Sequence, residues 1–244
     1  LDEENLASKK NQNNGGRAIT ILLRRCIQEI VGLVDRKTNR MSLISEDVVR
    51  KMYIADRDYL VVCIKALSNT SKILTEHECS SCSNRIESEI DFKDMDIYEW
   101  DEGEPAEVTV ELSKGFYHPQ KKEYFNKVVW SFPDGKVQEK IAAAESSKIA
   151  SVMMVSVIKE VVGLGFLPSL EDVKMLSLKD RNIFAESFIE NSVGVDTKIS
   201  LTCQYCGAEN ESEVDLLNFF NSGGGTQKKD TKNGKGGKRL RKKR

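Results

Sequence analysis

The segment Cys79-Ser-Ser-Cys-Ser-Asn-Arg-Ile-Glu-Ser-Glu-Ile-Asp-Phe92 is the most informative part of the sequence, because a second version of it occurs far along the chain. It aligns without gaps on Cys203-Gln-Tyr-Cys-Gly-Ala-Glu-Asn-Glu-Ser-Glu-Val-Asp-Leu216. Six of the fourteen positions are identical, including both cysteines and the Glu-Ser-Glu motif that follows them. The chain therefore contains two copies of one local sequence motif, each built around a CxxC turn.

Strand patterns surround both CxxC turns. Polar and apolar residues alternate from Ile86 to Phe92, which is the two-residue period of a half-exposed strand. Strands are also expected over Lys72 to His77 and Val195 to Thr202. Zinc takes four thiolates in a tetrahedron at about 2.3 Å, and one CxxC turn supplies only two. The sequence therefore predicts a split zinc ribbon, with one structural zinc ion bound by Cys79, Cys82, Cys203 and Cys206.

The separation of the two turns does not exclude a shared site. Cys82 and Cys203 are 121 positions apart, but the entropy of loop closure grows slowly with length. A zinc thiolate site can contribute on the order of 10 kcal/mol, which would offset that cost. A site with four cysteine ligands has no open position, so it would stabilise the fold rather than catalyse a reaction.

Other interpretations of the cysteines stay open at this point. They are two CxxC disulfides, four free thiols, a zinc ion shared between subunits, and an iron–sulfur cluster. The polar stretch Leu1 to Arg17 has no apolar signal-peptide core, so a reducing compartment is the default and metal is favoured over disulfides. A thioredoxin-like redox role is disfavoured, because that CxxC sits at a helix N-terminus. His77 could replace a cysteine ligand but is interpreted as a surface residue, and Cys26 and Cys63 are predicted to be buried in helices.

Helical patterns dominate the rest of the chain, which predicts an α+β fold with a mainly helical body. Helices are expected over Ala18 to Val34, after a cap at Ser45, and over Arg57 to Leu67. The β-branched and alternating segments 108–112 and 128–132 predict a small antiparallel sheet. A turn at Pro133-Asp-Gly135 then leads to a long helix over Lys136 to Leu164, ended by Gly163 and Gly165, and two short helices capped by Ser169 and Ser177.

These patterns divide the chain into four parts. Residues 1–16 are expected to be disordered, 17–70 to form N-terminal helices, and 222–244 to form a flexible basic tail. Between them, residues 71–221 are interpreted as a zinc-ribbon domain. Its two knuckles, 72–92 and 196–220, enclose an inserted hairpin and helical subdomain at 105–195.

Charge and composition exclude several kinds of function. With two histidines, no glycine-rich phosphate loop and no nucleophile paired with a base, the sequence predicts no enzyme and no small-molecule substrate. Asp101, Glu102 and Glu104 are interpreted as a solvated loop. No run of 18 apolar residues is present, so no membrane span is expected.

The basic tail contrasts with an acidic body. Residues 1–227 hold 27 Lys and Arg against 37 Asp and Glu, whereas residues 228–244 hold ten against one. Such a tail can be solvated, or it can contact an acidic protein surface or nucleic acid. The second functional hypothesis is therefore a nucleic-acid-associated zinc-ribbon protein that uses its basic tail.

Three segments resemble a known family. They are the C-terminal pattern Gly194–Phe220 with its second knuckle, the segment Arg57-Asp-Tyr-Leu-Val-Val, and the hairpin ending Phe132-Pro-Asp-Gly135. Across about residues 42–222 the chain resembles the T4-type bacteriophage baseplate hub subunit and tail assembly proteins. The resemblance implies a virion structural or assembly protein, made in the host cytoplasm and located in the tail baseplate. Its partners would be other baseplate or tail proteins, and no catalytic residue carries over. Ser83 departs from the pattern, since the second turn has Gly207 at this position.

Overall fold

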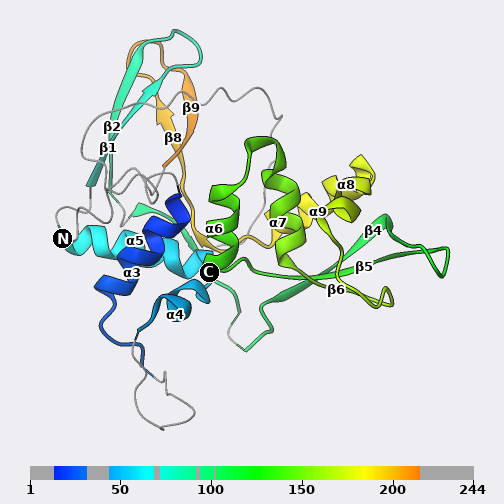
Figure 1. Cartoon of the computed structure of the whole chain (residues 1–244). Coiled ribbons are helices and arrows are strands. Elements are labelled where there is room, and N and C mark those ends of the chain that lie inside the picture. The colour runs from blue at the N-terminus through cyan, green and yellow to red at the C-terminus, as the bar shows by residue number, and fades with distance from the viewer. Residues whose placement is uncertain (1–13, 32–43, 69–71, 92–93, 102, 215–244) are drawn as a thin grey trace.

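The computed structural model describes residues 14–31, 44–68, 72–91, 94–101 and 103–214 of the chain. Helices and small antiparallel sheets alternate through these segments, which confirms the predicted α+β class (Figure 1). The basic tail and residues 1–13 lie outside the described residues, so the expectations about them stay predictions.

The first helix begins earlier and ends sooner than its pattern predicts. α3 spans Gly15–Cys26, because Asn14 Oδ1 accepts the Arg17 N–H at 2.9 Å and caps the helix. Gly16 is required in this first turn: a Cβ there would lie 2.8 Å from the backbone of Gln138. Because the helix stops at Cys26, that side chain is exposed and the prediction of its burial is wrong; Cys63 is half-buried.

Two further helices complete the N-terminal layer. α4 covers Glu46–Arg50, and Ser45 Oγ accepts the Val48 N–H, so the predicted cap is confirmed. α5 covers Ile54–Ser68. Together with α3 they surround an apolar cluster whose fully buried members include Leu23, Val49 and Val61.

Among the described residues, the strand pairs are antiparallel and fall into four small sheets. Two are hairpins: β1 (Lys72–Glu78) with β2 (Arg85–Asp91), and β8 (Lys198–Thr202) with β9 (Glu209–Glu213). A third joins the short strands β3 (Ile97–Tyr98) and β7 (Gly194–Val195). The fourth has the order β4 (Glu107–His118), β5 (Glu123–Ser131) and β6 (Ile158–Val161).

The prediction of one long helix over Lys136 to Leu164 is wrong. The segment forms α6 (Gly135–Ala143), the short 3-10 turn η2 (Ser146–Lys148), α7 (Ile149–Val157) and then strand β6. Val161 pairs with Val128 of β5, and both are buried, so sheet packing overrides the helical period at this point. The Pro133-Asp-Gly135 turn also has a second role, because Asp134 caps α6 by accepting the Val137 N–H at 3.0 Å.

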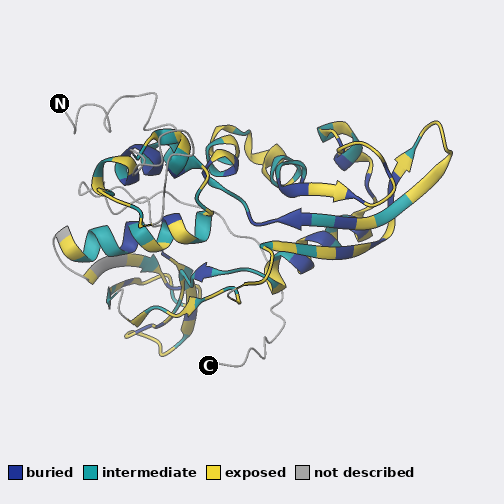
Figure 2. Ribbon diagram, turned by 90° about the horizontal axis from the view of Figure 1, so that it is seen from below, coloured by how far each residue is buried: buried dark blue, intermediate teal, exposed yellow. Residues whose placement is uncertain are grey.

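The last two helices hold the three-stranded sheet in place. Ser169 caps α8 (Leu170–Met175) and Ser177 caps α9 (Leu178–Glu190), as predicted. Asp180, in the first turn of α9, is buried and accepts N–H bonds from Ser113, Lys114 and Gly115 where β4 bulges. Trp130 and Val128 of β5 are fully buried and belong to the larger apolar core. Figure 2 shows dark blue, buried stretches along the strands of this sheet, and yellow, exposed residues toward the end of the β4–β5 hairpin.

A buried arginine joins the N-terminal helices to α6. The Arg57 side chain is 0 % exposed, and its guanidinium donates to Val49 O at 2.8 Å and to Gln138 Oε1 at 2.9 Å. It also donates to Gly16 O at 3.1 Å and to Thr20 Oγ1 at 2.9 Å. Gly135 makes room for it, since a Cβ there would lie 2.4 Å from Nη1.

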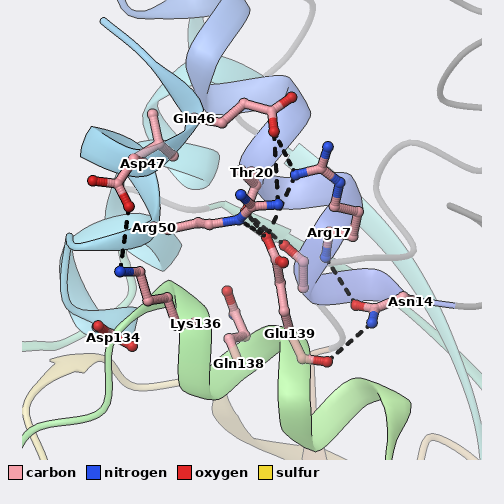
Figure 3. A network of polar contacts seen from close by, with 12 residues as sticks. Asn14, Arg17, Thr20, Glu46, Asp47, Arg50, Asp134, Lys136, Gln138 and Glu139 are labelled. Atoms are coloured by element: carbon pink, nitrogen blue, oxygen red, sulfur yellow. Dashed lines mark hydrogen bonds and ion pairs between the residues drawn. The ribbon is translucent and has the colours of Figure 1, made fainter.

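Glu139 of α6 supplies the negative charge beside this arginine. Its Oε1 accepts from Thr20 Oγ1 at 2.7 Å and from Arg50 Nε at 2.9 Å, so three helices meet at one carboxylate (Figure 3). We call Arg57, Thr20, Gln138, Glu139 and Arg50 the arginine cluster. Burial lowers the pKa of Arg57 to about 10 and raises the pKa of the neighbouring Asp58 to about 6.

Candidate metal centre

Two equivalent turns bring the four predicted cysteines together. Cys79 and Cys82 lie in the turn between β1 and β2, and Cys203 and Cys206 lie in the turn between β8 and β9. The two hairpins stand side by side in the upper left of Figure 1, and Ser80 N donates to Asn210 Oδ1 at 2.9 Å across them.

Both turns use the same backbone hydrogen bonds. Cys79 N donates to Asn84 O at 2.9 Å, and Cys203 N donates to Ala208 O at 2.8 Å. The following bond also repeats: Ser83 N donates to Cys79 O, and Gly207 N donates to Cys203 O. Because both turns have this geometry, each pair of thiols points to the same side of its loop, as the aligned sequences suggest.

The position after the second cysteine is left-handed in both turns. Ser83 has φ of 57° and Gly207 has φ of 72°. Glycine adopts this conformation freely, whereas a side chain makes it less favourable. The departure at Ser83 therefore leaves the turn geometry intact but places a residue with a Cβ in a conformation that favours glycine.

The sulfur positions fit a tetrahedral metal ion. All four Sγ atoms lie within 4.8 Å of one another. Cys79 Sγ is 3.6 Å from Cys206 Sγ, and Cys82 Sγ is 3.7 Å from Cys203 Sγ. Zinc–sulfur bonds of about 2.3 Å in a tetrahedron place neighbouring sulfurs about 3.8 Å apart. The four cysteines are free thiols rather than disulfides, and this set of donors could hold a metal ion.

The four thiols differ in exposure and in acidity. Cys79 and Cys203, the first of each pair, are buried, whereas Cys206 is exposed. Backbone N–H groups of Cys82 and Ser81 lower the pKa of Cys79 to about 6, and the neighbouring thiols add to the effect. The Ala208 N–H lowers the pKa of Cys206, but contacts with Cys82, Cys79 and Cys203 outweigh it and raise the value to about 12. A cation is therefore what would allow all four sulfurs to be thiolates together.

Asn210 supports the cluster and was missed by the sequence analysis. Its side chain is 3 % exposed; Nδ2 donates to Ala208 O at 3.0 Å and lies 3.6 Å from Cys79 Sγ. Its Oδ1 also accepts from Ser80 Oγ at 2.9 Å. The aligned residue in the first hairpin is Ile86, which is buried as well. The sequence did contain a signal for this role, because the second copy of the repeat has the polar Asn210 where the first copy has the apolar Ile86.

The other candidate residues lie apart from the sulfurs. His77 Nδ1 is 3.2 Å from Ser212 Oγ, and the group of possible ligands among the described residues includes no histidine there. Asp101 and Glu104 are exposed, and Glu102 lies outside the described residues. His118 Nδ1 accepts the Lys121 N–H at 3.3 Å in a hairpin turn. Among the helices in the described part of the chain, none is long and apolar enough to cross a membrane.

Comparison with known proteins identifies one family. The family model described as T4 bacteriophage base plate protein matches residues 2–221, which is most of the chain. Searches of curated proteins and of solved structures return no match.

Proposed function

We propose that this chain, which belongs to the T4 bacteriophage base plate protein family, is a structural or assembly protein of a contractile phage tail. It would act through contacts with other baseplate proteins, in or near the central hub, and not as an enzyme. The family match over residues 2–221 is the observation that carries this proposal. The mature location would be the virion tail, after synthesis in the host cytoplasm.

We further propose that Cys79, Cys82, Cys203 and Cys206 bind one structural zinc ion. The sulfur spacing supports this, and so does the small amount of apolar packing between the two cysteine turns. The buried residues of the cluster between the two turns are only Cys79, Ile86 and Cys203 among the residues that the structure describes. With so little core, the metal would supply the cohesion that joins the hairpins.

In this proposal the two hairpins form a single split zinc ribbon. The knuckles are residues 72–92 and 196–220 of a domain spanning 71–221, and the segment 105–195 is inserted between them. The four thiolates would hold together the two hairpins that precede and follow the inserted segment, so that its surfaces are fixed for contact with partners.

The nucleic-acid hypothesis has less support. Three glutamates of β9, Glu209, Glu211 and Glu213, are exposed beside the cysteines and would repel a phosphate backbone. The basic tail that motivated the hypothesis lies outside the described residues.

Metal analysis tests the zinc proposal. We expect one zinc per chain in protein purified without added chelator, and fewer than about 0.1 after Cys82 and Cys206 are both changed to Ser. Replacing Cys26 and Cys63 together is the matched control, because neither belongs to the sulfur cluster. A folded wild-type protein free of zinc and other metals would contradict the proposal.

Infection with phage lacking this chain tests the baseplate proposal separately. We expect incomplete tails and loss of infectivity, restored by the wild-type chain supplied in trans. Finding complete, contractile tails of normal composition would contradict a baseplate role but would leave the metal site unaffected.

A further inference from the structure

A hairpin projects from the body and carries an exposed pair of tyrosines. β4 and β5 extend to the far right of Figure 1, and the end of this hairpin is exposed in Figure 2. Tyr117 and Tyr124 face each other across the strands with ring centroids 5.0 Å apart, and they are 46 % and 47 % exposed. Large exposed aromatic side chains of this kind are enriched at protein interfaces.

Lysines surround these two rings. The segment 113–127, which we call the hairpin tip, holds Lys114, Lys121, Lys122 and Lys127 against one acid, Glu123. Lys114 Nζ lies 4.2 Å above the Tyr124 ring, and Lys121 Nζ donates to Gly163 O. The ion pairs found between described residues include none of these four lysines. The tip therefore presents positive charge next to aromatic surface.

The opposite end of the molecule has the complementary charge. Together, β1–β2 and β8–β9 hold eight acidic residues against three basic ones: Glu76, Glu78, Glu87, Glu89, Asp91, Glu209, Glu211 and Glu213 against Lys72, Arg85 and Lys198. The alternation of β9 buries Asn210 and leaves Glu209, Glu211 and Glu213 exposed on one face. We call these three glutamates the acidic face. Both views place the two hairpins at the end of the molecule away from the tip (Figures 1 and 2).

We propose that the hairpin tip of one copy docks on the acidic face of a second copy, so that the chain self-associates head to tail. The charges of the tip and of the acidic face are opposite, and the tyrosine pair supplies the apolar area that a charge contact alone lacks. Such a contact uses two different surfaces, so it produces rings or open chains rather than a two-fold dimer. The charges are present whether or not the protein enters a baseplate. The self-association proposal and the baseplate proposal can therefore fail independently.

Sedimentation velocity of the purified 244-residue chain tests this contact. We expect the average mass to rise with protein concentration at about 0.05 M salt. It should return to that of a monomer near 1 M salt, where the screening length falls to about 3 Å. A monomer at all concentrations in low salt would overturn the proposal.

Two charge reversals identify the surfaces. The tip variant combines Lys121→Glu with Lys122→Glu, and the face variant combines Glu209→Lys with Glu211→Lys; all four residues are exposed. Each variant alone should weaken self-association at least about tenfold, because equal charges then meet. An equimolar mixture should associate again, since the reversed tip of one variant complements the reversed face of the other.

Matched controls exclude effects of net charge. The pair Lys140→Glu and Lys148→Glu makes the same change on exposed helical positions and should leave association within about twofold. Failure of the mixture to reassociate would overturn the head-to-tail contact. So would a result in which deletion of residues 228–244 abolishes association while the tip variant does not, because the acidic face would then meet the basic tail instead.

Discussion

The cysteine cluster and the arginine cluster both join distant parts of the chain, but they do so by different physical means. The cysteine cluster consists of Cys79, Cys82, Cys203 and Cys206. It brings together turns 121 residues apart with four sulfurs and little apolar packing. The arginine cluster joins α3, α4, α5 and α6 through a buried guanidinium, beside an apolar cluster that includes Leu23 and Val61. All the partners of Arg57 belong to the chain itself, whereas in the proposed zinc site the four sulfurs would share an ion taken from solution.

This difference predicts two kinds of stability. The hairpins should hold together only when metal is bound, and their stability should follow metal concentration. The helices around Arg57 should be insensitive to chelators and should respond instead to any change that leaves buried polar groups without partners.

Cys203→Ser should have the largest effect. A structural zinc ion can contribute on the order of 10 kcal/mol to stability. We expect this variant to lose most of that stabilisation, because it removes one of the four proposed zinc ligands. Hydrogen exchange of backbone amides should become fast in β1, β2, β8 and β9 while α5 and α6 stay protected. Cys26→Ser, at an exposed position, is the control and should change neither region. Unchanged exchange in the hairpins of Cys203→Ser would show that they do not need the metal.

Arg57→Met should destabilise the helical layer by about 3–5 kcal/mol. The carbonyls of Gly16 and Val49 and the Gln138 side chain would lose their donor inside the protein. Urea unfolding measures this. Arg85→Met, on an exposed strand position, should cost less than about 1 kcal/mol. An equal loss of unfolding free energy in the two variants would contradict the prediction that the buried Arg57 matters more for stability than the exposed Arg85.

Asp58→Asn should stabilise the protein at pH 8 by up to about 3 kcal/mol. Burial raises the pKa of Asp58 to about 6, above the value near 3.9 expected in the unfolded chain. The folded state therefore binds more protons, so the contribution of this group is fully present below pH 4 and is lost as pH rises through 6. Unfolding of both proteins by urea at pH 5 and pH 8 should show the variant's advantage growing with pH. An advantage independent of pH would mean that Asp58 is already charged in the folded protein at pH 5.

Ser83→Gly should stabilise the first cysteine turn by about 1 kcal/mol, because glycine adopts its positive φ without strain. Gly207→Ala should have the opposite effect of similar size, since the space around Gly207 is open and only its conformation resists a side chain. Competition with a zinc-binding dye measures both as small, opposite changes in apparent zinc affinity. Changes of the same sign would show that the two turns are not equivalent.

Local chemistry explains why several elements could be predicted. Ser45, Ser169 and Ser177 each cap the helix that they were expected to cap, since a cap depends on residues within one turn. Strands on both sides of each CxxC pair were also predicted, because the repeat contains both the CxxC spacing and the alternation. The strand expected from Val195 to Thr202 is divided, since Val195 belongs to β7, which pairs with β3, and β8 begins at Lys198. Expectations failed where distant partners decide. Val161 lies in a strand because β5 is beside it. The prediction for Cys26 failed for a local reason, since α3 ends at this residue.

The α+β class and the clustering of four cysteines could be predicted from residue type and spacing within short segments. Only the tertiary structure decided that Arg57 is buried among backbone carbonyls, that Asn210 supports the sulfurs, and that the basic hairpin tip and the acidic face lie at opposite ends. The physical reason is that burial and charge separation depend on which segments meet in space. The repeated CxxC motif is the exception, because its two copies share a residue type and a spacing that indicate each other; Arg57 and Asn210 have no such repeated signal.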